Sequence, residues 1–426
     1  MMSYRGGRQE TDGPGRPVIR PRSLRGNRRL PAERASFRDW VAEVPSTTYA
    51  SHGMYYYPAR FIPQVVRWSL NQYSRPGDWV LDPFAGSGTV AVESLLTGRN
   101  SLSLDLSPML GPLVAAKTYR GASWEDLERG YRAVTTSRSR YRPPWSRIGY
   151  WHPPELLDTL GQLWGGYHDH PHPLLLIALL RTTRRFSYAD AVVPKLFKSR
   201  RKTAEITRMV RGDYRRALRE DLRSNLEAVY AASRDFEQRY RGGRALVRER
   251  TDLLEYTPRR RVRLVLTSPP YGIAHEYIRS VKLELAWMGL TDSEITDLTH
   301  REIPYRSPPP FRVNSPTYEK LLPRIEGPAR KNCERYFASI LFVLGRVLGR
   351  IEPGGHAALF VGNATFAGVE MPYAQIFWEH LEPEGYAFER LLEDPIRGHR
   401  LFRGRRNRSP DGIAVERLLV LRREAP

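Results

Sequence analysis

A short stretch of the chain, Ser268-Pro269-Pro270-Tyr271, combines a hydroxyl group, a rigid backbone and an aromatic ring. The apolar run 264–266 stands directly before it, as expected of a strand buried on both faces of a parallel sheet. The two prolines lack N–H donors and fix the backbone, so the strand must end there. Ligands of open α/β sheets lie at the carboxyl ends of the strands, where this stretch falls. A proline turn with a surface tyrosine is the alternative that the stretch alone leaves open.

A second stretch connects a predicted strand, residues 79–81, to a helix predicted to begin at Val90. Its residues are Asp82, Pro83, Phe84, Ala85, Gly86, Ser87, Gly88 and Thr89. Glycines let a backbone approach a ligand closely, and a helix N-terminus presents free N–H groups. The loop lacks the Gly-Lys-Ser/Thr sequence of a phosphate-binding P-loop and the third glycine of the dinucleotide fingerprint. The spacing of Gly86 and Gly88 is by itself weak evidence for any one ligand.

Two acids follow further predicted strands. Asp105 lies in the alternating stretch 101–106, 17 residues after Gly88, and Asp252 follows the strand predicted at 245–247. In nucleoside-binding α/β folds, an acid near this offset at the end of the second strand takes ribose hydroxyls. A helix N-cap or a turn acid is the alternative for Asp105.

The charge of the chain favours a polyanionic partner. Of 426 residues, 68 are Lys or Arg and 46 are Asp or Glu, which gives a formal net charge of +22. Nucleic acid is the simplest such partner, with a solvated basic surface as the alternative. The single cysteine, Cys333, excludes an internal disulfide framework and a multi-cysteine zinc site. The longest apolar run, 174–180, is far shorter than the ~20 residues that cross a bilayer, so we expect a soluble protein.

Residues 120–242 are predicted to form a helical insertion between the two motifs. Basic and aromatic residues interleave there, a composition suited to a DNA backbone and to splayed bases. The candidate nucleic-acid contacts are Lys195, Lys198, Arg200, Arg201 and Lys202. A solvated basic loop is the alternative. His168, His170 and His172 invite a metal interpretation, but their alternate spacing in a polar, proline-containing loop favours a solvated turn.

Together these motifs resemble those of the exocyclic-amino DNA methyltransferases, which use S-adenosylmethionine to methylate cytosine N4 or adenine N6. The 82–89 loop looks like the cofactor motif of that family, and the Ser-Pro-Pro-Tyr stretch at 268–271 looks like its catalytic motif. Asp105 matches the ribose-binding acid, and Asp252 matches the acid after the third strand. The segment that resembles the cover over the methionine part of the cofactor begins with Tyr57, Pro58 and Ala59.

The resemblance implies an α/β, Rossmann-like S-adenosylmethionine-dependent methyltransferase fold with a central, mostly parallel, seven-stranded sheet and a helical insertion. We expect a disordered basic tail at 1–36 and the cofactor motifs in a first part at 37–119. The insertion at 120–242 is the candidate target-recognition region, and a second part at 243–426 carries the catalytic motif. The polar, proline-rich segment 291–332 competes with the insertion for target recognition.

The implied reaction explains the residue types of the motifs. A base amine is a poor nucleophile because its lone pair is delocalised, and the base must be flipped out of its duplex at a cost of a few kcal/mol. Ser268 Oγ and the Pro269 carbonyl would accept hydrogen bonds from the amine, while Tyr271 would stack on the base. Positioning would supply most of the effect. No covalent intermediate is needed, and Cys333 stands far from both motifs, which disfavours the ring-carbon cytosine class.

The choice of base rests on Ser268. The adenine enzymes of the family mostly carry Asp or Asn at this position and the cytosine-N4 enzymes mostly Ser, so cytosine N4 is favoured. The expected partners are double-stranded DNA and a cognate restriction endonuclease, in the cytoplasm of a prokaryote and associated with its nucleoid, with neither a membrane nor a metal involved. The alternatives are adenine-N6 methylation, methylation of an RNA base amine, and a catalytically inactive nucleic-acid-binding homologue.

Overall fold

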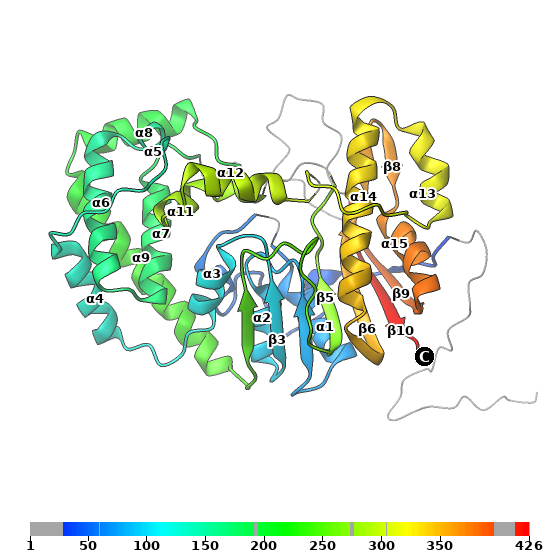
Figure 1. Cartoon of the computed structure of the whole chain (residues 1–426). Coiled ribbons are helices and arrows are strands. Elements are labelled where there is room, and N and C mark those ends of the chain that lie inside the picture. The colour runs from blue at the N-terminus through cyan, green and yellow to red at the C-terminus, as the bar shows by residue number, and fades with distance from the viewer. Residues whose placement is uncertain are drawn as a thin grey trace, which may run out of the picture.

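A computed structural model describes residues 29–58, 60–190, 195–272, 277–303, 305–395 and 414–425. Within this part of the chain, an eight-stranded sheet has the order β1-β9-β10-β6-β5-β2-β3-β4, and β7 pairs with β8 in a separate hairpin (Figure 1). The strands are β1 (Glu33–Arg34), β2 (Trp79–Asp82), β3 (Asn100–Leu104), β4 (Ala245–Arg248), β5 (Val262–Thr267), β6 (Ile351–Gly362), β7 (Ala364–Phe366), β8 (Val369–Met371), β9 (Tyr386–Pro395) and β10 (Val415–Arg423). Only β10 runs antiparallel to its neighbours in the large sheet.

Helices cover both faces of the sheet. They are α1 (Pro63–Tyr73), α2 (Thr89–Leu96), α3 (Leu110–Lys117), α4 (Trp124–Thr136), α5 (Ile148–Trp151), α6 (Pro154–Asp169), α7 (Pro173–Arg185), α8 (Arg200–Val210), α9 (Tyr214–Arg239), α10 (Tyr277–Ser280), α11 (Lys282–Trp287), α12 (Asp292–Arg301), α13 (Pro316–Leu321), α14 (Gly327–Leu348) and α15 (Tyr373–Leu381). None of the helices in the described ranges is long and apolar enough to span a membrane.

The strand β5 shows why the sheet needs a layer of helices on each of its two faces. Leu264 and Leu266 pack into a cluster with Val65 and Val66 of α1, whereas Val265 packs into a cluster on the other face with residues of α14 and α15. Successive side chains of a strand point to opposite faces, so an unbroken apolar run requires a helix layer on each side. The predicted α/β fold is therefore present, and β5 lies near its centre.

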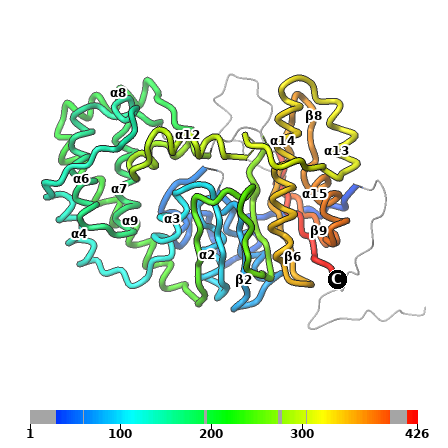
Figure 2. The backbone as a smooth tube through the Cα atoms, viewed as in Figure 1, coloured from blue at the N-terminus to red at the C-terminus, as the bar shows by residue number. Residues whose placement is uncertain are grey.

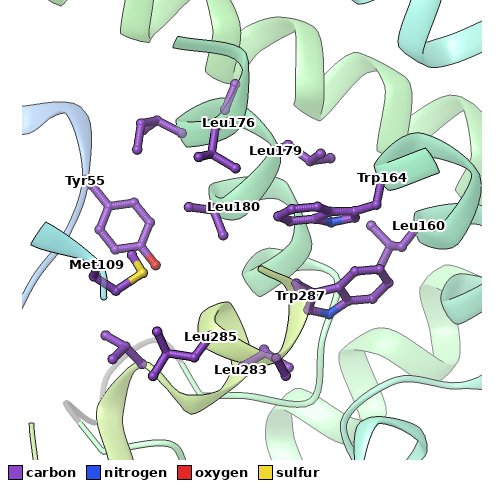
Figure 3. Packing of buried hydrophobic residues seen from close by; sticks show 14 of the residues in the cluster. Tyr55, Met109, Leu160, Trp164, Leu176, Leu179, Leu180, Leu283, Leu285 and Trp287 are labelled. Carbon is purple, nitrogen blue, oxygen red and sulfur yellow. The ribbon is translucent and has the colours of Figure 1, made fainter. Parts of the chain in front are cut away.

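A second core lies beside the sheet, in a helical unit that we define as α4–α9 together with α11 and α12. Figure 3 shows part of this core, where Trp164 of α6 and Trp287 of α11 stack with ring centroids 5.6 Å apart. Tyr55 and Met109 join the same cluster from the sheet side. The insertion is thus helical as predicted, but its core also takes residues from 281–298, which the sequence assigned to the catalytic part. Figure 2 shows α12 running from this unit over the sheet toward α14.

The predicted disorder of the tail at 1–36 is wrong for residues 29–36. Leu30 is buried, its N–H donates to the Gln375 side chain at 2.9 Å, and β1 pairs in parallel with β9 at the edge of the sheet. Apolar Leu30 and the exposed backbone of β9 explain this order, because an edge strand offers unpaired backbone groups. The pairing adds an eighth strand to the seven predicted. Residues 1–28 lie outside the described residues.

Two further elements differ from the sequence prediction. The strand β9 was not predicted, because charged residues interrupt its alternation at Glu389 and Arg390. The segment 291–332 contains α12, α13 and the start of α14 rather than a polar loop. A capping box, in which Thr291 and Glu294 each bond the other's backbone N–H, begins α12.

Candidate active site

The carboxyl ends of β2, β3, β4 and β5 meet at one edge of the sheet, because these four neighbouring strands are parallel. A cleft with about 950 Å³ of empty space opens there. The chain order reverses between β2 and β5, and such a switch point is where open α/β sheets bind ligands. Two segments reach this edge: the cofactor loop, residues 82–89, and the SPPY turn, residues 268–272.

The structure brings most of the predicted site residues to this cleft. Those that line it are Tyr57, Pro58, Pro83, Phe84, Ala85, Gly86, Ser87, Asp105, Asp252, Ser268, Pro270 and Tyr271. Four others lie behind the lining, namely Asp82, Gly88, Thr89 and Pro269. Ala59 lies outside the described residues.

The two glycines of the cofactor loop, Gly86 and Gly88, share a left-handed backbone conformation but differ in what lies beside them. Gly86 has a φ of +50°, and a Cβ there would lie 3.4 Å from the Tyr57 ring, which covers the loop. Gly88 has a φ of +77°, and a Cβ there would lie 2.4 Å from Val114 Cγ2. The positive φ favours glycine at both positions, and at Gly88 the close approach of Val114 also excludes a Cβ. The loop therefore holds its backbone close to the cleft on one side and close to α3 on the other.

Asp82 connects the two motifs directly. Its Oδ1 accepts a hydrogen bond from Thr267 Oγ1 at 2.7 Å, and Thr267 is the residue immediately before Ser268. The same oxygen accepts the Phe84 N–H at 3.2 Å. Asp82 is buried, and this burial raises the pKa of its carboxyl to about 7. The carboxyl thus fixes the start of the cofactor loop against the end of the catalytic strand.

The other two predicted acids face the cleft and are hydrogen bonded. Asp105 accepts the Gly86 N–H and the Ser107 N–H, each at 2.7 Å, and burial raises the pKa of its carboxyl. Each carboxylate oxygen keeps a second lone pair that a ligand hydroxyl can use. Asp252 accepts the Leu254 N–H at 2.9 Å and forms ion pairs with Arg301 and Arg306. Arg301 is the last residue of α12, and Arg306 lies shortly after that helix.

The cofactor loop also has a buried cation behind it. Lys117, at the end of α3, is fully buried and its Nζ donates to the Ser87 carbonyl oxygen at 2.7 Å. Burial, together with the charge of nearby Arg60, lowers the pKa of this amine to about 7. This contact could not be predicted, because an apolar helix pattern with one lysine near its end is common on protein surfaces.

The SPPY turn faces the cleft opposite the cofactor loop. Ser268 and Tyr271 are partly exposed there, and Tyr277 of α10 lines the cleft beside them. Burial raises the pKa of the Tyr271 phenol, and the charge of Glu416 raises it further, so the phenol stays protonated at neutral pH. The turn thus presents a hydroxyl and a neutral aromatic ring to the cleft, as its residue types predict.

The predicted nucleic-acid residues lie on the helical unit, around the start of α8. Lys198 Nζ sits over the rings of Tyr150 and Tyr188, 4.5 and 4.0 Å from their centroids, and Phe197 beside it is 51% exposed. Arg200 is exposed. Within the chain, Arg201 pairs with Asp190, the buried Lys202 pairs with Glu205, and Lys198 Nζ donates to the Tyr150 carbonyl oxygen at 3.2 Å.

The three neighbouring histidines have other roles than metal binding where their contacts are described. His172 accepts the Leu174 N–H at 3.2 Å and caps α7, and His168 packs its ring against Tyr141. The described residues contain no group of three or more His, Cys, Asp and Glu side chains arranged to hold a metal.

Comparison with known proteins finds similarity to DNA methyltransferases around the cofactor loop. A family model described as DNA methylase matches residues 22–110, which include the cofactor loop and Asp105. The chain is 40% identical over 70 residues to the type II methyltransferase M.MjaII of Methanocaldococcus jannaschii, covering 16% of this chain and 13% of that protein. This part of the chain is therefore similar to the exocyclic-amino DNA methyltransferases.

Longer matches extend the similarity within this family. The type II methyltransferase M.BsoBI of Geobacillus stearothermophilus is 21% identical over 296 residues, covering 62% of this chain and 58% of that protein. The type II methyltransferase M.MvaI of Kocuria varians is 31% identical over 130 residues, covering 27% and 29%. The chain therefore spans less than two thirds of each of these relatives. The solved structure of TrmN from Thermus thermophilus is 13% identical at a TM-score of 0.30, over 85% of this chain and 49% of that one.

Similarity to the DNA methyltransferases implies S-adenosylmethionine as the cofactor, and the cleft fits that molecule. Ser87 Oγ lines the cleft, is buried, and has no hydrogen-bond partner among the described residues, so a polar ligand group has a place there. Tyr57 offers an apolar ring over the loop, and Asp105 offers free lone pairs for hydroxyls. The residues that would hold the cofactor are therefore Tyr57, Ser87 and Asp105, with the backbone of Gly86 between them.

Proposed function

We propose that the protein methylates the exocyclic N4 amine of a cytosine flipped out of duplex DNA. When bound, S-adenosylmethionine supplies an electrophilic methyl group, whose bonding electron pair leaves with the sulfur. Ser268 Oγ and the Pro269 carbonyl accept hydrogen bonds from the amine, which draws its nitrogen toward tetrahedral geometry and localises its lone pair. The nitrogen gains the bond to the methyl carbon and gives up a proton to water. Tyr271 stacks on the extruded base.

The observation that carries this proposal is the hydrogen bond between Asp82 and Thr267. It joins the first residue of the cofactor loop to the residue before Ser268, so both motifs face one cleft with a fixed separation. Methyl transfer to a neutral amine needs such positioning more than it needs a charged catalyst, because aligned reactants gain most of the rate. A protein that had lost activity and kept only DNA binding would have no use for this link.

Serine at position 268 supports cytosine over adenine. The resemblance to the cytosine-N4 enzymes rests on this side chain, whereas the adenine enzymes mostly carry Asp or Asn. A serine hydroxyl is neutral and can both accept from the amine and donate to a neighbour. Adenine N6 is the second candidate base, and the same turn would serve it if the pocket admits a purine.

The substrate surface is proposed to lie on the helical unit, around Lys195, Lys198 and Arg200. Cations beside the exposed rings of Tyr150 and Phe197 suit phosphates and unpaired bases. Double-stranded DNA is the proposed partner because a base amine in DNA is the substrate of the family. A cognate restriction endonuclease remains a prediction from the resemblance alone.

The test is transfer of a labelled methyl group from S-adenosylmethionine to duplex DNA, followed by digestion and identification of the modified nucleoside. We expect N4-methyldeoxycytidine. We expect Ser268→Ala to lower the single-turnover rate by roughly 10²-fold or more, since one donor or acceptor at the reacting group is removed. Ser101→Ala is the matched control, because Ser101 is a buried serine of β3 outside the cleft.

The alternatives give different results in the same assay. If the product is N6-methyldeoxyadenosine, the target base is adenine and not cytosine. If only RNA is labelled, the substrate is RNA and not DNA. Full activity of Ser268→Ala would refute the role of its hydroxyl. Binding of DNA without any methyl transfer would identify an inactive homologue.

A further inference from the structure

Two buried tyrosines hold the backbone of the SPPY turn from the side away from the cleft. Tyr336 of α14 donates its hydroxyl proton to the Pro270 carbonyl oxygen at 2.9 Å. Tyr373, the first residue of α15, accepts the Gly272 N–H on its hydroxyl oxygen at 3.3 Å. The two bonds flank Tyr271, one on each side, and they come from different helices.

The turn needs such partners because it cannot supply its own. Pro269 and Pro270 carry no N–H, so the turn has few donors with which to close backbone hydrogen bonds. The tyrosines need partners as well, since their exposed fractions are 1% and 0% and a buried hydroxyl without a hydrogen bond costs free energy. Burial raises the pKa of both phenols, so both stay protonated at neutral pH.

Packing fixes the two tyrosines with little freedom to move. Their rings stack with centroids 5.2 Å apart and planes at 28°, and Phe337 packs edge-on against Tyr373 at 5.0 Å. Phe366 of β7 completes the wall. The hydroxyls are therefore held by a rigid apolar cluster, not by flexible side chains.

Gly272 shows how closely this cluster meets the turn. A Cβ at Gly272 would lie 2.5 Å from the Tyr373 hydroxyl, 2.8 Å from Phe366 Cζ and 2.9 Å from Tyr336 Cδ1. No other residue type fits without displacing the rings. The glycine after the tyrosine is thus required by the two helices behind the turn, a role that the sequence alone did not indicate.

The hydrogen bond at Pro270 also gives the carbonyl groups of Pro269 and Pro270 different roles. Tyr336 occupies the Pro270 carbonyl, whereas the Pro269 carbonyl is the acceptor assigned to the amine. We infer that Tyr336 and Tyr373 are positioning residues, which hold the turn so that Ser268, the Pro269 carbonyl and the Tyr271 ring meet the target amine. This inference rests on the proposed function.

The test compares Tyr336→Phe and Tyr373→Phe with Tyr318→Phe in the full chain. Tyr318 is a buried tyrosine of the same cluster that packs on Phe337 and makes no described hydrogen bond to the turn. Each change removes one oxygen and keeps the ring. The measurements are the single-turnover rate of methyl transfer to DNA, the Kd for S-adenosylmethionine, thermal unfolding, and hydrogen exchange of the peptide that covers 268–272.

We expect each of the two positioning variants to lose roughly 10- to 100-fold in transfer rate, because small misplacements of reacting groups are costly. Their Kd for S-adenosylmethionine should stay within about twofold, and exchange at 268–272 should become faster. Tyr318→Phe should match the wild type in rate and exchange. If the wild type is active and both Tyr336→Phe and Tyr373→Phe keep its full rate, this inference is wrong but the proposed function stands. If the wild type methylates nothing, the proposed function itself is wrong.

Discussion

At Gly88 two separate constraints exclude a side chain, a φ of +77° and an approach of 2.4 Å to Val114. Gly77 has a φ of +91° with no atom within 4 Å of the place of a Cβ, so it carries the first constraint without the second. We therefore expect Gly88→Ala to lower the free energy of unfolding by roughly 1–3 kcal/mol more than Gly77→Ala does, as overpacking usually costs. Urea unfolding of both variants measures the difference, and equal losses would show that Val114 moves aside freely.

The carboxyl of Asp82 gives a prediction about pH. Its pKa is raised to about 7 from an ordinary value of 3.8, chiefly by burial. A carboxyl with a raised folded-state pKa adds stability that is fully present below its unfolded pKa and is lost as pH rises through the folded pKa. Relative to the wild type, Asp82→Asn should therefore gain stability as pH rises from 4 to 7 and then level off. Urea unfolding without cofactor from pH 4 to 8 tests this, and a difference that does not vary with pH would contradict it.

Residue types predicted much of the site because its chemistry is local in sequence. Ser268, Gly86 and Asp105 could be placed from short motifs that each follow a strand, and parallel strand ends meet at one edge. The contacts of Lys117 and Tyr336 could not be predicted, because each joins residues that are far apart in sequence and neither lies in a motif. Such partners are set by helix packing, which a single sequence does not reveal.

At the scale of elements, the helical unit depends on α11. Trp287 is fully buried, stacks on Trp164, and donates from Nε1 to His152 at 3.1 Å. We expect Trp287→Ala to destabilise the protein by about 3–5 kcal/mol, as large-to-small core substitutions of tryptophan do. Trp124→Ala is the control, because Trp124 of α4 is only partly buried. Thermal and urea unfolding measure both, and equal losses would mean that α11 contributes little to this core.

Elements whose apolar residues follow a clear period were predicted well, but the elements that they pack against were not. The insertion was predicted to be helical from the spacing of its apolar residues. Apolar runs before the motifs predicted β2 and β5, and the alternating stretch 101–106 predicted β3. The prediction missed α12 because its segment is polar and rich in proline, although Thr291 and Glu294 form a capping box that marks a helix start. It also gave no hint that α11 and α12 pack with the insertion, because side-chain periodicity specifies a buried face and not its neighbour.

The whole molecule carries an excess of positive charge, with a formal net charge of +22. Affinity for duplex DNA should therefore fall steeply with salt, since each neutralised phosphate contributes about −0.9 to the slope of log K against log salt. Replacing Lys195, Lys198 and Arg200 with alanine should make this slope shallower by up to roughly three such contributions. The measurement is fluorescence anisotropy with one duplex at several salt concentrations.

The control for the salt experiment is a variant with Arg129 and Arg132 changed to alanine. Both are exposed on α4, where they pair with Asp126 and Glu128. We expect this variant to keep the wild-type slope. If the two variants change the slope equally, the surface around α8 has no special part in binding.

The shared core of the helical unit bears on how such proteins can be recombined. A graft that exchanged only residues 120–242 with a relative would leave Trp287 facing a foreign surface, with its stacking partner Trp164 replaced. The unit of exchange is therefore discontinuous in the gene, comprising the insertion and a second piece from α11 through α12. Chimaeras that carry both pieces should fold, because their junctions then lie outside the two cores and outside both motifs.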